Sequence, residues 1–157
     1  MTGRHEVERL RKRLVATFAR IDRLGTDLEI RADFARHLCV LVSGFFENAV
    51  VELLLAYCSR CCHPGIVRYV ESRLEWFTNA NREKLLQLLG SFDPAWRTEL
   101  EAFVIDERDA ALNSVVALRN DIAHGGSGNV SYVQIKLYYE RIEEIIDKLA
   151  DMLDPVT

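Results

Sequence analysis

Apolar side chains recur every three to four residues along most of the chain, which is the period of amphipathic α-helices. This spacing predicts a first helix over about residues 5–24, which Gly25 should end. Thr26 and Glu29 have the spacing of a capping box, so a second helix should begin there and run to about residue 59. Because this second helix is apolar on nearly all sides, we expect it at the centre of a bundle.

Turn-forming residues divide the rest of the sequence into further helices. No run of alternating β-branched residues is bounded by hairpin turns, so no sheet is predicted. The pattern therefore predicts an all-α bundle of about five to seven helices, folded as a single domain over residues 1–157. Beyond the first two, the expected helices cover about 66–77 after Pro64-Gly65, 79 or 81 to 89 with Gly90 as its end, 96–124 as one helix or two after Asp93-Pro94, and 131–153 capped by Ser131 with Gln134.

Charge and composition limit the classes of protein to which this chain can belong. The chain is 49% hydrophobic and 28% charged, with a net charge of −4, so no global positive field marks it as a nucleic-acid binder. Residues 1–36 nevertheless carry nine Lys and Arg against six Asp and Glu, which is either a local basic surface or the solvated face of a helix. No apolar run begins the chain, and the stretch over 38–57 contains Glu47 and Glu52, so we expect a cytoplasmic protein without a membrane span.

The cysteines suggest a metal site only weakly. Cys58 and Cys61 have a Cys-x2-Cys spacing and His63 follows, but a second pair of ligands is missing. In the cytoplasm these side chains should be reduced thiols, packed or half-exposed at a helix end. We therefore expect no metal and no cofactor.

One segment near the end of the helical stretch combines two kinds of chemistry. In Arg119-Asn120-Asp121-Ile122-Ala123-His124, an arginine and a histidine stand five positions apart, just before two glycines. Arginine is a permanently charged fork of donors that fits phosphate oxygens, whereas histidine exchanges a proton near neutral pH. Together, Arg119 and His124 indicate chemistry on a phosphodiester without a metal.

The spacing also constrains the geometry. Five residues along an ideal helix separate the Arg119 and His124 side chains by about 140°, so they do not share a face. Either the helix unwinds at its glycine end, or one site combines side chains from two protomers. Asn120 does share the face of His124 and could orient the imidazole. The alternative is an ordinary exposed arginine and a histidine that is favourable at a helix C-terminus.

Arg119, Asn120 and His124 resemble the Arg-x4–6-His motif of HEPN domains (higher eukaryotes and prokaryotes nucleotide-binding), in which a polar residue usually follows the arginine. Segments 43–48, 79–84 and 89–93 are similar to successive landmarks of stand-alone bacterial HEPN proteins of the RiboL-PSP type, so the resemblance covers about residues 30–150. Toxins of a related subgroup carry a tyrosine two residues after the histidine, which a partner nucleotidyltransferase modifies. Here that position is Gly126.

The resemblance implies a homodimer in which two motifs line one cleft. It also implies that the protein is a metal-independent endoribonuclease of a toxin–antitoxin or other defence system. His124 would act as acid and base while an RNA 2′-hydroxyl attacks the adjacent phosphate, Arg119 would bind that phosphate, and Asn120 would orient one of them. The expected product carries a 2′,3′-cyclic phosphate, and DNA would be inert. RNA, a second copy and an antitoxin or regulatory protein are the implied partners. The alternative is a non-catalytic HEPN dimer that binds RNA or nucleotides or scaffolds another protein.

Further polar residues could support this site. Arg82 and Lys84 either contact RNA phosphates or belong to a solvated helix face. Glu47 and Asn48 either reach the cleft or satisfy each other and backbone groups in the core. Asp121, within the motif, is a further supporting candidate. The sequence contains no recognition code for a particular RNA.

Overall fold

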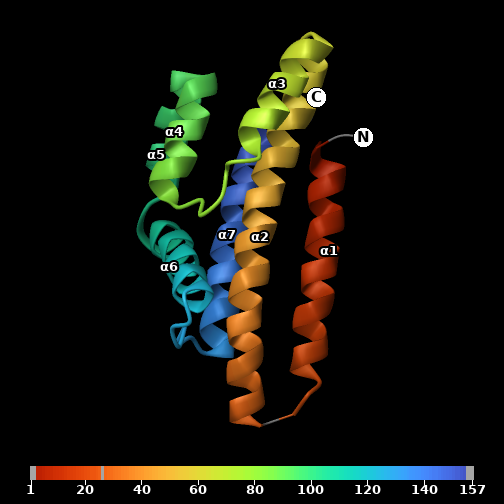
Figure 1. The fold of residues 1–157 in the computed structure, drawn as a ribbon. Helices are drawn as coiled ribbons and strands as arrows, with labels where there is room; N and C mark the ends of the chain where they lie inside the picture. The colour runs from red at the N-terminus through yellow and green to blue at the C-terminus, as the bar shows by residue number, and fades with distance from the viewer. Residues whose placement is uncertain (1–2, 26, 155–157) are drawn as a thin grey trace.

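The computed structural model describes residues 3–25 and 27–154, and in this part of the chain it contains α-helices and no strand. The all-α prediction is thereby confirmed. α2 lies at the centre, between α1 and α7, and α6 packs against both α2 and α7 (Figure 1). The short α3 lies beside the C-terminal end of α2, and α4 and α5 form a helical hairpin. The helices are α1 (Gly3–Asp22), α2 (Leu28–Cys61), α3 (Pro64–Leu74), α4 (Arg82–Phe92), α5 (Pro94–Phe103), α6 (Asp106–Ala123) and α7 (Tyr132–Leu153).

α2 is the core helix, as its sequence predicted. In the part of the chain that the structure describes, it is the helix whose length and composition would suffice to cross a membrane. In the bundle its apolar side chains face α1, α6 and α7 instead, and Leu38, Phe46 and Leu54 are almost completely buried. Burying a large apolar side chain contributes about 1.5–3 kcal/mol, so this helix supplies much of the stabilisation of the bundle.

The starts of several helices differ slightly from the sequence prediction, those of α2 and α3 among them. Thr26 lies outside the described residues, and the side chain that caps α2 is Asp27, whose carboxylate accepts the backbone N–H groups of Glu29 and Ile30 at 3.0 and 3.3 Å. α3 begins two residues earlier than expected, because Pro64 occupies its first position, where a missing N–H is harmless.

Gly90 does not end α4, so that prediction was wrong. The helix continues to Phe92, and a Cβ at position 90 would lie only 3.0 Å from Cδ of Arg97 on α5. This glycine therefore allows α4 and α5 to approach closely instead of terminating a helix. Asp93 serves both helices, since its N–H binds the Leu89 carbonyl at 2.9 Å and its carboxylate accepts the N–H of Ala95 at 2.8 Å.

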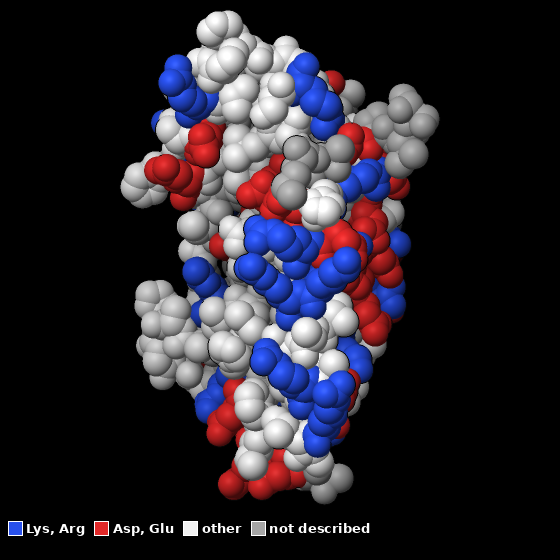
Figure 2. Space-filling model, turned by 90° about the vertical axis from the view of Figure 1, so that its right-hand side faces the viewer, with Lys and Arg blue, Asp and Glu red and all other residues white. Residues whose placement is uncertain are grey.

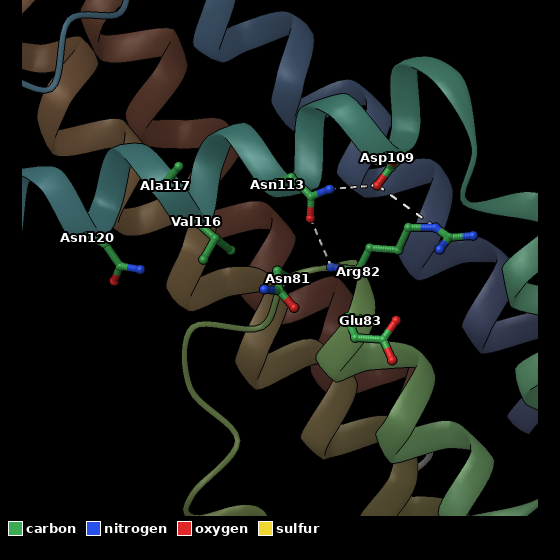
Figure 3. A pocket seen from close by; sticks show the side chains of 8 residues that line it. All are labelled: Asn81, Arg82, Glu83, Asp109, Asn113, Val116, Ala117 and Asn120. Atoms are coloured by element: carbon green, nitrogen blue, oxygen red, sulfur yellow. Dashed lines mark hydrogen bonds and ion pairs between the residues drawn. The ribbon is translucent and has the colours of Figure 1, made fainter.

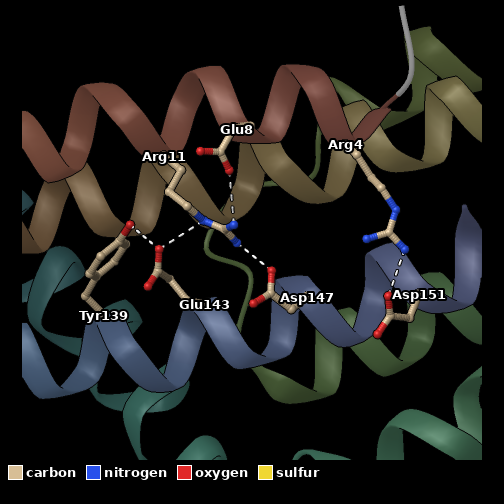
Figure 4. A network of polar contacts seen from close by, with 7 residues as sticks. All are labelled: Arg4, Glu8, Arg11, Tyr139, Glu143, Asp147 and Asp151. Atoms are coloured by element: carbon tan, nitrogen blue, oxygen red, sulfur yellow. Dashed lines mark hydrogen bonds and ion pairs between the residues drawn. The ribbon is translucent and has the colours of Figure 1, made fainter. Parts of the chain in front are cut away.

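A row of charged contacts joins the outer edges of α1 and α7 (Figure 4). The Arg11 guanidinium lies 2.6 Å from Asp147 and 3.0 Å from Glu143, and Tyr139 donates to Glu143 at 2.5 Å. Burial alone would lower the pKa of Arg11, but the hydrogen bond and attraction to Asp147 outweigh it and raise the pKa. Long charged side chains thus connect α1 to α7, and both of these helices pack against α2.

Candidate functional site

The Arg119–His124 segment occupies the last turns of α6. Arg119 is half-buried, whereas His124 is exposed and is the residue that caps the helix. α-Helical hydrogen bonding continues to this point, because the His124 N–H binds the Asn120 carbonyl at 3.1 Å. The helix therefore does not unwind before the histidine. Within one protomer, the Arg119 and His124 side chains are therefore separated by about 140° around the helix axis, as in an ideal helix.

The turn after His124 is a Schellman motif. The N–H of Gly126 binds the Asp121 carbonyl at 2.8 Å and the N–H of Gly125 binds the Ile122 carbonyl at 3.1 Å, while Gly125 adopts φ +81°. The Asp121 carboxylate accepts the N–H of Gly128 at 2.8 Å. Asp121 thus folds the glycine segment back onto the end of α6 and fixes the backbone on both sides of His124.

Arg119 is anchored by a residue from another part of the chain. Its Nη1 donates to Oδ1 of Asn79, in the connection between α3 and α4. The backbone N–H of Asn79 in turn donates to Oε1 of Glu47 on α2 at 2.7 Å. A carboxylate, an asparagine and the candidate phosphate-binding arginine therefore form one chain of hydrogen bonds across three segments. Glu47 thus accepts a backbone N–H, as one of the two alternatives from the sequence had it, and its contact with Arg119 passes through Asn79. Its support of the site stays a prediction.

A polar groove of about 490 Å³ lies between α6 and the start of α4 (Figure 3). Asn120 lies at one end of it and Asp109 at the other, with Asn81 and Asn113 between them. Asn113 accepts the backbone N–H of Arg82 at 3.1 Å. Asn120 is thus the residue of the motif that lines this amide-rich groove, and Arg119 and His124 are not among its lining residues. No hydrogen bond joins the Asn120 amide to the His124 imidazole in the described residues, so its orienting role stays a prediction.

Arg82 and Lys84 make contacts within the chain. Arg82 donates to the carbonyls of Val104 and Glu101 at 2.7 and 3.1 Å, and Lys84 donates to the Thr78 carbonyl at 2.8 Å. Arg82 therefore fastens α4 to the α5–α6 connection, and Lys84 fastens the α3–α4 connection. Their contact with RNA phosphates stays a prediction.

Five of the nine basic residues in 1–36 lie along one exposed face of α1 and the turn that follows it. Figure 2 shows Lys and Arg side chains along this face of the molecule, next to acidic ones. The stripe consists of exposed residues of α1 and of the turn that follows it: Arg9, Lys12, Arg13, Arg20 and Arg23. It lies on a different helix from the Arg119 segment. Asn48 is also exposed and borders a small apolar groove between α1 and α2, away from the contact made by its neighbour Glu47.

Two of the cysteines are protonated thiols at neutral pH. Burial raises the pKa of Cys39 to about 11, and burial followed by the neighbouring thiols raises the pKa of Cys58 to about 11. Cys61 and Cys62 place their sulfur atoms 3.6 Å apart at the exposed end of α2. In residues 3–25 and 27–154, no three His, Cys, Asp or Glu side chains are grouped so that they could hold a metal ion.

The chain matches the family model described as RiboL-PSP-HEPN over residues 6–154, nearly its whole length. It belongs to this HEPN family. HEPN domains include ribonucleases and nucleotide-binding proteins, and they commonly dimerise and bind RNA. A search of curated proteins gives no significant match, and neither does a search of solved structures.

The residue that sequence reasoning missed in this HEPN domain is Asn79. The sequence indicated it only as one of two caps for α4, and in the structure that cap is Asn81, which accepts the N–H of Lys84 at 3.0 Å. Asn79 adopts φ +53° instead and binds Arg119. The one available signal was its place in a landmark segment of the family, which does not indicate a contact with α6.

Proposed function

We propose that this HEPN domain is a metal-independent endoribonuclease whose active site forms where two copies bring their Arg119–His124 segments together. His124 takes the proton of an RNA 2′-hydroxyl as that oxygen attacks the adjacent phosphorus. The P–O5′ bond breaks, and the 5′-oxygen receives a proton from the second copy of His124. Arg119 binds the phosphate and offsets the negative charge that develops on it.

The observation that carries this proposal is the pairing of an anchored arginine with an exposed histidine at the end of one helix. Arg119 uses one donor on Asn79, which leaves other guanidinium N–H groups for a ligand. The imidazole of His124 is exposed and makes no hydrogen bond to the described residues. Both groups are thus available to a phosphodiester, in a family that includes ribonucleases.

The helical geometry supports pairing of two copies. Because α6 stays helical up to His124, the two side chains point in directions about 140° apart, and a second copy can supply the missing group. Apolar side chains for a homodimer interface are present on α2, where Val40 is 42% exposed, and on α7, where Val133 and Leu137 are 65% and 51% exposed. A strictly monomeric species at micromolar concentration in sedimentation would contradict this arrangement.

The test is cleavage of RNA by the purified protein in the presence of a chelator. We expect products that end in a 2′,3′-cyclic phosphate and no cleavage of DNA, which lacks the attacking hydroxyl. Arg119→Ala and His124→Ala should each lower the cleavage rate by about 10²–10⁴-fold, the usual contribution of a positioned catalytic group. Arg20→Ala and His5→Ala remove the same side-chain types from exposed positions on α1 and should leave the rate unchanged.

The outcomes separate the alternatives. Equal cleavage by wild type and both motif variants would place the activity elsewhere and overturn the proposal. Binding of RNA without cleavage would favour a non-catalytic HEPN dimer. We further propose that the enzyme acts in the cytoplasm as a toxin or defence effector restrained by an antitoxin or regulatory protein. Growth arrest on expression, relieved by His124→Ala, is the expected result.

A further inference from the structure

Asn79 has a backbone conformation that most residues avoid. Its φ of +53° lies in the left-handed region, where residues other than glycine are strained and asparagine is among the better tolerated. Such a conformation persists only when surrounding contacts hold it, and it is concentrated at functional sites. Here Ala80 is fully buried, and Lys84 donates to the carbonyl of Thr78 at 2.8 Å. The connection is therefore fastened on both sides of Asn79.

The direction of each hydrogen bond around Asn79 is fixed by chemistry. A guanidinium can only donate, so the side-chain oxygen of Asn79, not its nitrogen, must face Arg119. The backbone N–H of Asn79 can only donate, so the carboxylate of Glu47 must accept it, and it does so at 2.7 Å. Both contacts are partly buried, which strengthens them relative to contacts in water.

We propose that Asn79 is a positioning residue that aims the Arg119 guanidinium at the substrate phosphate, and that Glu47 sets the orientation of Asn79. This inference rests on the proposed ribonuclease function. A free arginine side chain samples many rotamers, and holding one nitrogen on Asn79 leaves the others presented in a single direction before RNA arrives. Asn79 does not touch the reacting atoms. Its effect on cleavage passes through Arg119.

The left-handed conformation allows a clean test. Asn79→Gly removes the acceptor oxygen but keeps the backbone, because glycine adopts φ +53° without strain. We expect kcat for RNA cleavage to fall by about 10–100-fold, the effect of a misplacement of about 1 Å at a reacting centre. KM should change by less than about threefold, because proteins generally hold a nucleic acid by the sum of contacts to many phosphates. The thermal unfolding midpoint should not fall.

Asp106→Gly is the matched control. Asp106, at the first residue of α6, is the other described non-glycine residue with positive φ, at +52°, and makes no side-chain hydrogen bond to Arg119. The same substitution in the same backbone conformation should leave kcat unchanged. Asn79→Asp keeps an acceptor oxygen at the same distance from the backbone and should restore kcat to within about threefold of wild type. Glu47→Gln keeps an acceptor for the Asn79 N–H and should cleave faster than Glu47→Ala.

The results distinguish this proposal from the ribonuclease proposal itself. If Arg119→Ala and His124→Ala leave cleavage intact, the ribonuclease assignment fails. If those variants lose activity but Asn79→Gly matches Asp106→Gly, the positioning role alone is overturned. A higher kcat for Asn79→Gly would show that the contact restrains Arg119, and an Asn79→Asp variant as slow as Asn79→Gly would show that the acceptor oxygen is not what matters. Either result also rejects the inference.

Discussion

Gly128 offers a quantitative test of how the turn after His124 is built. Its φ is +54°, and a Cβ placed there would lie 2.3 Å from Cγ1 and 2.8 Å from Cδ1 of Ile122. An alanine in the left-handed region costs about 1–2 kcal/mol. Inserting a methyl group into a packed site typically costs a further 1–3 kcal/mol or so. Gly128→Ala should therefore lower the free energy of unfolding by about 2–5 kcal/mol.

Gly25→Ala separates the two contributions. Gly25 has φ +79°, but a methyl group added to it would meet no atom of the described residues beyond its chain neighbours within 4 Å, so only the conformational cost of about 1–2 kcal/mol applies. Urea denaturation followed by circular dichroism, at one protein concentration for all variants, measures both changes. The steric contribution should shrink when Gly128→Ala is combined with Ile122→Ala, because the clashing side chain is then gone. Equal losses for Gly25→Ala and Gly128→Ala would refute the contact with Ile122.

Two further predictions concern charged and phenolic groups on α1 and α7. Burial raises the pKa of Tyr132 to about 12, and its hydrogen bond to Asp22 adds to this. The unfolded chain loses this proton near pH 10 and the folded chain near pH 12, so the associated stability is lost as the pH rises through this window. Urea titrations in this range should show a shallower decline for Tyr132→Phe, and an unchanged slope would contradict the assignment. Arg11→Gln should lower the free energy of unfolding by about 1–2 kcal/mol at low salt and by less at high salt, whereas Arg9→Gln, which loses one exposed pair, should change it by less than about 1 kcal/mol. A salt-independent effect at Arg11 would count against the ionic origin.

Helices whose signals are local could be predicted from the sequence. α7 combines a 3.6-residue apolar period with a cap at Ser131, whose hydroxyl accepts the N–H of Gln134 at 3.1 Å. α2 could be placed at the centre because it is apolar on nearly all sides. The motif on α6 was also recognisable, since Arg119 and His124 stand at a fixed spacing before a glycine turn.

Features that depend on a distant partner could not be predicted. The structural role of Gly90 depends on Arg97 of the next helix. In the local sequence, nothing distinguishes Gly90 from a glycine that ends a helix. The sequence left open whether Arg82 and Lys84 contact RNA phosphates or belong to a solvated helix face, and it gave no sign of their hydrogen bonds to carbonyl groups of the same chain. The contact between Asn79 and Arg119 joins residues 40 positions apart and exists only after α2, α4 and α6 have packed.

The packing at Gly126 limits which side chains this position can hold. A Cβ at this position would lie 2.0 and 2.6 Å from the two carboxylate oxygens of Asp121, the second of which, Oδ2, accepts the N–H of Gly128. Any side chain here must therefore dislodge Asp121. The tyrosine that a nucleotidyltransferase modifies in related toxins would stand at this very position. A tyrosine at position 126 would therefore fit only after the Asp121 carboxylate has moved and released the N–H of Gly128.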